Sequence, residues 1–215
     1  RLGARDRVVL VVDAEPDGDD FDLALDASAA ADGPIAALAG LDAPLDMRVR
    51  GDGTWTQWEG ALLVRSEDER VAALQLTNRA GRFGLLGTVD PTVFLTGLPA
   101  EALGDKVALK GDIAIDNRVF DGTAIVAGRK VSLSAEGLVD LADNRADDLE
   151  MVVRVRDPAV LGDGIALRDT RLTATLDGSF DDLAIAHEAR VGELDIGGTV
   201  LTRLRQEGTA RYDGT

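Results

Sequence analysis

The sequence predicts an all-β protein: one elongated antiparallel repeat sheet, curved into a groove or taco with an apolar interior, with short helical connectors. Two observations lead to this prediction. Apolar and polar residues alternate with period two in many segments, most clearly in Leu45–Arg50, which is typical of strands with one buried face. The gaps between these segments are short and often contain glycine or asparagine, which indicates an antiparallel meander rather than strands joined by crossover helices.

Strands are expected along nearly the whole chain. In order, they cover Arg7–Asp13, Phe21–Ala27, Leu45–Arg50, Thr54–Val64, Val71–Thr77, Arg82–Val89, Val107–Asp116, Val119–Ala127, Val131–Leu141, Leu149–Arg156, Ile165–Leu176, Leu183–Val191 and Leu194–Tyr212. A tight turn is expected at Gly51–Gly53, and Gly60 predicts a bulge or a close approach of the backbone. Trp55 and Trp58 are three residues apart, so a regular strand would direct them to opposite faces. A bulge between them would instead place both on one face, at the lip of the groove.

Three proline-containing segments predict short helices or helical turns between groups of strands. They are Ala29–Leu41, Asp90–Leu103 and Asp157–Leu161. Proline near the start of each segment suits the first turn of a helix.

The chain is predicted to be a single elongated unit over residues 1–215, with weak repeats at about 41–104, 105–162 and 163–215. The order strand, glycine, aromatic, acid, glycine recurs, as in Arg50–Ala61 and Lys110–Thr123. Repeats of this kind stack on their neighbours and form a continuous apolar seam. The chain begins Arg-Leu-Gly and ends within a strand pattern, so we expect an internal segment of a longer protein.

Composition excludes several classes of function. The net charge of -16 argues against a nucleic-acid partner, because binding to phosphates needs clustered Lys and Arg. The absence of cysteine removes disulfides, thiolate chemistry and soft metal sites. The acidic turn Asp17–Asp20 does not fit the spacing of an EF-hand loop.

No residues are predicted to be catalytic, to bind a cofactor or to bind a metal. The only histidine, His187, shares a strand face with Leu183 and Ile185, and no nucleophile motif accompanies it. Paired carboxylates such as Asp147–Asp148 lie in turns, whereas glycosidases need carboxyl groups that face each other across a cleft. The sequence therefore predicts a protein that is not an enzyme.

Several motifs resemble the repeats of the TamB and AsmA-like family of bacterial cell-envelope proteins, the translocation and assembly module group. These motifs are Leu41–Leu45, Arg50–Gly53, Trp58–Leu63, Gly87–Val89 and the Asp157–Pro158 connector. The resemblance implies a β-groove with an apolar lining, in a parent chain anchored in the inner membrane and crossing the periplasm. It also implies phospholipid transport and outer-membrane protein assembly, with an Omp85-type outer-membrane barrel partner reached through regions outside this chain.

From these observations we expect a non-catalytic periplasmic bridge segment that holds phospholipid acyl chains, or nascent outer-membrane protein strands, along the groove. The residues expected to line it are Leu45, Met47, Val49, Leu74, Leu76, Val107, Leu109, Ile113, Ile115, Leu183, Ile185, Leu194 and Ile196. The alternative is a closed structural or adhesive β-solenoid, such as a surface passenger domain, whose interior is dry. A single bulge in any strand would invert these face assignments.

Overall fold

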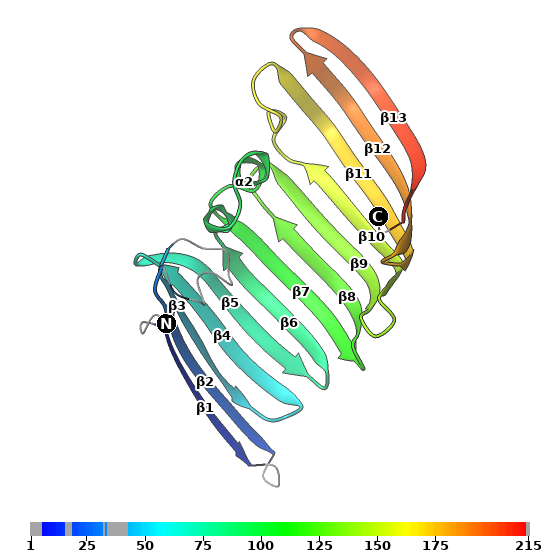
Figure 1. Cartoon of the computed structure of the whole chain (residues 1–215). Coiled ribbons are helices and arrows are strands. Elements are labelled where there is room, and N and C mark those ends of the chain that lie inside the picture. Colours follow the sequence, from blue (N-terminus) through cyan, green and yellow to red (C-terminus); the bar gives the residue numbers. More distant parts are fainter. Residues whose placement is uncertain (1–5, 16–18, 32, 34–42, 214–215) are drawn as a thin grey trace.

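A computed structural model describes residues 6–15, 19–31, 33 and 43–213. These residues form one sheet of 13 strands that lie side by side in chain order, each antiparallel to its neighbours (Figure 1). The strands are β1 Arg7–Glu15, β2 Asp20–Ala29, β3 Leu45–Gly53, β4 Gln57–Ser66, β5 Glu69–Arg79, β6 Arg82–Val89, β7 Val107–Asp116, β8 Val119–Ala127, β9 Val131–Asp140, β10 Arg145–Val155, β11 Ile165–Ser179, β12 Asp182–Ile196 and β13 Thr199–Tyr212. The predicted all-β antiparallel sheet is thus confirmed.

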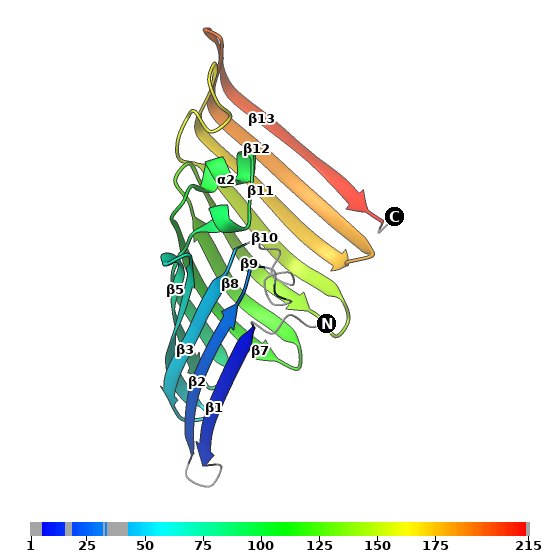
Figure 2. The same ribbon diagram turned by 60° about the vertical axis from the view of Figure 1, so that its left-hand side comes forward.

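The sheet stays open along its whole length. It twists and bends, so that β1 and β13 run in clearly different directions when the molecule is turned (Figure 2). Such a twist follows from the right-handed twist of each strand. Contacts between elements are made almost entirely by consecutive strands, and no second layer covers the described part of the sheet.

One predicted connector contains helices, one forms only helical turns, and one lies largely outside the described residues. Between β6 and β7 the chain forms the 3-10 helix η1, Pro91–Val93, and the helix α2, Leu98–Leu103. Asp157–Leu161 instead forms successive turns, with a hydrogen bond of 3.1 Å from the Val160 N–H to the Asp157 carbonyl. The Asp157 carboxylate binds the Ala159 N–H at 2.9 Å, which favours this turn over a continued helix. The segment Ala29–Leu41 falls mostly among residues outside the description.

The connectors are joined to the ends of neighbouring strands by backbone hydrogen bonds. The Arg129 N–H donates to the Leu103 carbonyl at 2.8 Å, and the Asp157 N–H donates to the Lys130 carbonyl at 3.1 Å. Both connectors therefore meet the turn between β8 and β9. Four strands, β3–β6, precede the connector between β6 and β7, and four strands, β7–β10, lie between the two connectors.

Two predicted turns are misplaced. The turn at Gly51–Gly53 is wrong, because all three residues remain paired in β3 and the chain reverses at 54–56. There the Thr54 side chain accepts a hydrogen bond from the Gln57 N–H at 2.9 Å, which fixes the reversal. The predicted boundary between the strands Leu183–Val191 and Leu194–Tyr212 is also misplaced. Strand β12 continues to Ile196, and the chain turns at Gly197 and Gly198, whose φ angles of 58° and 90° suit a tight hairpin.

Candidate functional site: the apolar face

The apolar face of the sheet is the candidate functional site, and it is defined by two rows of cross-strand partners. The first row consists of Leu10, Leu25, Val49, Leu62, Leu74, Gly87, Leu109, Val126, Leu133, Val153, Leu172, Ala189 and Gln206. The second consists of Val12, Leu23, Gly51, Gly60, Leu76, Leu85, Gly111, Ala124, Ala135, Met151, Ala174, His187 and Gly208. Directly paired residues share a face. Neither row contains Asp, Glu, Lys or Arg, so a continuous uncharged surface crosses all 13 strands.

The two rows stay continuous only if each strand keeps its apolar residues in register with those of its neighbours. At β10 the pairing shifts between Ala146 and Leu149, and Asp148 has a φ of 47°. The resulting bulge inserts one extra residue, so the three-residue step from Ala146 to Leu149 does not move the following residues off the apolar face. Met151 and Val153 therefore stay in the two rows, despite the acidic pair at residues 147 and 148.

Few side chains in the described part of the protein are fully buried. The buried apolar residues are Ala29, Val71, Ala72, Leu74, Val107, Ala146, Val152 and Val160, and none of the described polar or charged residues is buried. The accessible surface is 13812 Å², whereas a compact protein of 22.6 kDa is expected to expose about 9,500 Å². The sheet thus leaves roughly 4,300 Å² more surface in contact with solvent than a globular fold of the same mass.

An aromatic cluster lies at one end of this face, where β2, β3 and β4 come together. The ring of Phe21 is 4.6 Å from that of Trp55 and 6.5 Å from that of Trp58, measured between centroids. Both tryptophans therefore contact the same phenylalanine, and the prediction that they point to opposite faces is wrong. Trp55 lies in the turn before β4, outside the regular alternation of the strand.

The ring of Trp58 also explains two glycines of the second row. A Cβ atom at Gly51 or Gly60 would lie only 2.0 Å or 2.3 Å from atoms of the indole. Their hydrogen side chains leave the space that the ring occupies. Pairing between β3 and β4 is unbroken through Gly60, so of the two predictions for this residue the close approach is the one observed.

The structure brings most of the predicted lining residues together on the apolar face. The strand registers place eleven of the thirteen predicted residues on this face: Leu45, Met47, Val49, Leu74, Leu76, Val107, Leu109, Ile113, Ile115, Leu183 and Ile185. Leu194 and Ile196 lie beyond an interruption in the β11–β12 pairing at Asp169 and Gly192. There Leu194 pairs with Leu167 on one side and Leu201 on the other.

Sequence reasoning missed several members of the first row. These are Leu10, Leu25, Leu62, Val126, Leu133, Val153 and Leu172. The period-two alternation within each strand contains the necessary signal. What it lacks is the register between strands, which decides whether two apolar stripes join on one face.

His187 is the only titratable side chain in the two rows of the apolar face. Its Nε2 atom lies 3.0 Å from Nε2 of Gln206 and shares a hydrogen bond with it. The imidazole ring extends over Gly208, where a Cβ atom would come within 3.0 Å of Cε1. Within the described residues, no group of three or more His, Asp or Glu side chains is arranged to hold a metal ion.

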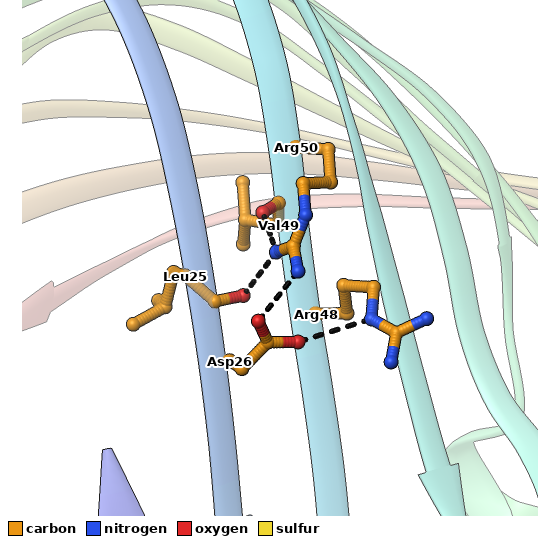
Figure 3. A network of polar contacts seen from close by, with 5 residues as sticks. All are labelled: Leu25, Asp26, Arg48, Val49 and Arg50. Atoms are coloured by element: carbon orange, nitrogen blue, oxygen red, sulfur yellow. Dashed lines mark hydrogen bonds and ion pairs between the residues drawn. The ribbon is translucent and has the colours of Figure 1, made fainter. Parts of the chain in front are cut away.

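The opposite face of the sheet is charged at both ends. Near β2 and β3, Arg48 Nε and Arg50 Nη2 bind the two carboxylate oxygens of Asp26 at 3.0 Å and 2.5 Å (Figure 3). Arg50 also donates to the carbonyls of Leu25 at 3.0 Å and Val49 at 2.7 Å. The hydrogen bonds from Arg50 and then Arg48 hold the pKa of Asp26 below its usual value.

Near the other end of the charged face, four arginines stand in one cross-strand row. Arg154, Arg171, Arg190 and Arg205 are successive partners on β10 to β13. Glu188 compensates part of this charge, because its Oε1 atom lies 2.8 Å from Arg190 Nε and 2.6 Å from Arg205 Nε. The hydrogen bond from Arg190 is the main reason that the pKa of Glu188 is lowered. The two faces are therefore sharply different in charge.

Comparison with known proteins does not identify a relative. No family model matches the chain, and neither a curated protein nor a solved structure matches it. In the part of the chain that the structure describes, no helix has the length and apolar character needed to cross a membrane.

Proposed function

We propose that this chain holds the acyl chains of phospholipids against its apolar face without catalysing a reaction. The observation that carries the proposal is the pair of uncharged rows that crosses every strand of an open sheet. Large uncovered apolar surfaces on proteins are normally interaction sites, because water does not favour them. A guest that is apolar along its length and needs no specific hydrogen bonds fits a surface of this kind.

The dimensions of the face suit a ligand that is longer than a typical pocket occupant. Twelve spacings between strands, at roughly 4.8 Å each, give a path of about 58 Å across the sheet. This path is nearly twice the roughly 30 Å thickness of a bilayer hydrocarbon core. An acyl chain with about twelve methylenes, half of whose surface is covered, would gain roughly 5 kcal/mol from burial. Such binding would be reversible, and an acyl chain would be free to shift along the face.

The proposal extends to the cellular setting that the resemblance to the TamB and AsmA-like family implies. The chain would be a segment of a periplasmic bridge whose parent protein is anchored in the inner membrane, and contact with an Omp85-type barrel would be made elsewhere in that protein. Nascent outer-membrane protein strands are a second possible guest class. The closed solenoid is less well supported, because solenoid coils stack around a closed interior whereas these strands form one antiparallel sheet.

A matched pair of leucines tests the proposal. Leu172 on the apolar face and Leu86 on the charged face are both exposed, at 41% and 54%, so neither substitution by aspartate removes a buried side chain. Ile113 on the apolar face and Ile125 on the charged face form a second pair. The protein would be purified from a Gram-negative host and examined by native mass spectrometry, with lipid extraction and identification.

The wild-type protein is expected to carry phospholipid. Leu172→Asp and Ile113→Asp should reduce the bound lipid at least several-fold, while Leu86→Asp and Ile125→Asp should leave it unchanged. Circular dichroism of each variant verifies that the sheet is intact. A wild-type protein that is free of lipid and does not take it up from vesicles would refute the proposal, and so would equal losses on the two faces. Release of lipid by an unfolded outer-membrane protein strand would assign the face to both guests.

A further inference from the structure

The row of four arginines on the charged face contains an inner pair that no carboxylate compensates. Arg154 on β10 and Arg171 on β11 are direct cross-strand partners, and both strands lie in the interior of the sheet. Like charges placed directly opposite each other destabilise a sheet. The chain has a net charge of -16, so acidic side chains are plentiful, yet among the described residues no carboxylate forms an ion pair with either arginine.

The outer pair of the row, Arg190 and Arg205, is compensated by two carboxylates. Glu188 lies between the two guanidinium groups and binds both of them. Glu207 Oε2 lies 3.0 Å from Arg205 Nη2. The acidic residues of β12 and β13 are therefore engaged by the outer arginines, and the positive charge of the inner pair remains.

Hydroxyl groups lie beside the inner pair on the same face. Arg171 donates from Nε to the Thr173 hydroxyl at 3.2 Å, whereas Arg154 has no hydrogen-bond or ion-pair partner among the described residues. Ser132 is the direct cross-strand partner of Arg154 on β9, and Ser134 lies two residues further along that strand. Arg154 and both serines line a shallow hollow of about 330 Å³. Most of the N–H donors of the two guanidinium groups thus have no acceptor in this part of the protein.

We propose that Arg154 and Arg171 bind the phosphate group of a phosphomonoester, with the hydroxyls of Ser132 and Thr173 as further donors. Arginine presents its N–H groups in a planar fork that matches the oxygens of a carboxylate or a phosphate. A carboxylate has two oxygens and one charge, which a single fork satisfies. A terminal phosphate has three free oxygens and a charge of about -1.5 to -2 at pH 7, so it can accept from both forks and neutralise both arginines.

The far end of the hollow limits the size of the anion. Glu136 and Glu150 are direct cross-strand partners there, four residues along from Ser132 and Arg154. Four residues of a strand span roughly 13 Å, and the two carboxylates at that end repel a second negative group. The hollow therefore suits one phosphate at its arginine end and not a polyanion along its length. Because the site lies on the face opposite to the apolar rows, it does not rest on the proposed binding of acyl chains.

Isothermal titration calorimetry of the whole chain with inorganic phosphate tests the site, and this probe contains no acyl chain. Arg154→Gln and Arg171→Gln should each weaken binding roughly tenfold, because each removes charge-assisted hydrogen bonds. Arg154→Lys keeps the charge but loses the fork, so an intermediate loss is expected. Arg79→Gln is the matched control, since Arg79 lies on the charged face of β5 with a side chain that is 75% exposed. This control should bind phosphate as the wild type does, and circular dichroism verifies that each variant is folded.

Two further probes test the chemistry and the source of the phosphate. Acetate, a single carboxylate, should not displace phosphate at equal concentration. Vesicles of phosphatidylcholine with and without phosphatidic acid test a lipid headgroup. Binding that needs phosphatidic acid and is lost in Arg154→Gln would assign the site to the headgroup, and binding of inorganic phosphate alone would assign it to a soluble phosphomonoester. Absence of binding to both probes, equal binding by the wild type and the glutamine variants, or displacement by acetate would overturn the proposal.

Discussion

Replacing Gly60 with alanine should destabilise the protein, because the indole of Trp58 occupies the space that a side chain would need. A Cβ atom at residue 60 would lie 2.3 Å from the Trp58 ring and 2.8 Å from the carbonyl oxygen of Arg50. The second contact is with backbone, so a rotation of the tryptophan alone would not relieve the clash. Either the strands β3 and β4 separate locally or the ring is pushed away from Phe21.

The expected cost follows from three contributions. Overpacking costs about 1–3 kcal/mol, and loss of the aromatic contact with Phe21 costs about 0.5–1.5 kcal/mol. The lower entropy of the unfolded chain returns about 0.4–1 kcal/mol when glycine becomes alanine. The net destabilisation should therefore be about 2 kcal/mol, which is large compared with the total stability of a typical domain.

Gly111 provides a matched control because it belongs to the same row of the apolar face. The nearest atom to a Cβ at this position would be Leu85 Cβ at 3.8 Å, an ordinary van der Waals contact. Gly111→Ala should thus be neutral or slightly stabilising. Urea unfolding followed by circular dichroism gives the free energy of unfolding of both variants. If Gly60→Ala and Gly111→Ala have the same stability, Trp58 does not lie over Gly60 and the reasoning fails.

Three further predictions follow from burial, from charge and from the open face. Val107→Ala removes two carbons from a side chain that is 2% exposed and should cost about 2 kcal/mol, whereas Val200→Ala on the exposed edge should change the free energy of unfolding by less than about 0.5 kcal/mol. The pKa of Asp26 is below its ordinary value of 3.8, so its stabilising effect is complete above that value and is lost as the pH falls through the lowered pKa. Asp26→Asn should accordingly be less stable than the wild type at neutral pH, and in urea titrations the difference should shrink as the pH falls through the lowered pKa of Asp26; a difference that does not shrink in acid would contradict this role. The native protein should enhance the fluorescence of an apolar dye without denaturant, and Leu172→Asp should reduce this signal more than Leu86→Asp does.

The existence and order of the strands could be predicted from the sequence because each strand has a local signal. In β3, the alternation of Leu45, Met47 and Val49 with charged residues is sufficient to identify a strand and both of its faces. The same holds for β7, predicted at Val107–Asp116 and observed with those bounds. Short gaps then require neighbouring strands to be antiparallel.

The positions of turns were harder to predict, since glycine has more than one use in this protein. Gly51 and Gly60 leave room for the indole of Trp58, whereas Gly197 and Gly198 form a turn with positive φ angles. The sequence contains these four glycines, but it does not show that the indole of Trp58 lies over Gly51 and Gly60. Gly192 illustrates the same difficulty: it lies within β12, opposite the irregular residue Asp169, and does not end the strand.

The apolar face forms because the register pairs the apolar residues of neighbouring strands with one another. It cannot be recognised in any single strand. Each strand contacts mainly its two neighbours, so the sheet is stabilised locally and its length is not limited by a central core. A globular protein of this mass would bury such rows against a second layer. Here the rows remain continuous and uncharged even across the acidic bulge at residues 147 and 148, where a shift of one residue would have placed charges on the apolar face. That continuity gives physical support to a function in which one guest, or several, extends across many strands.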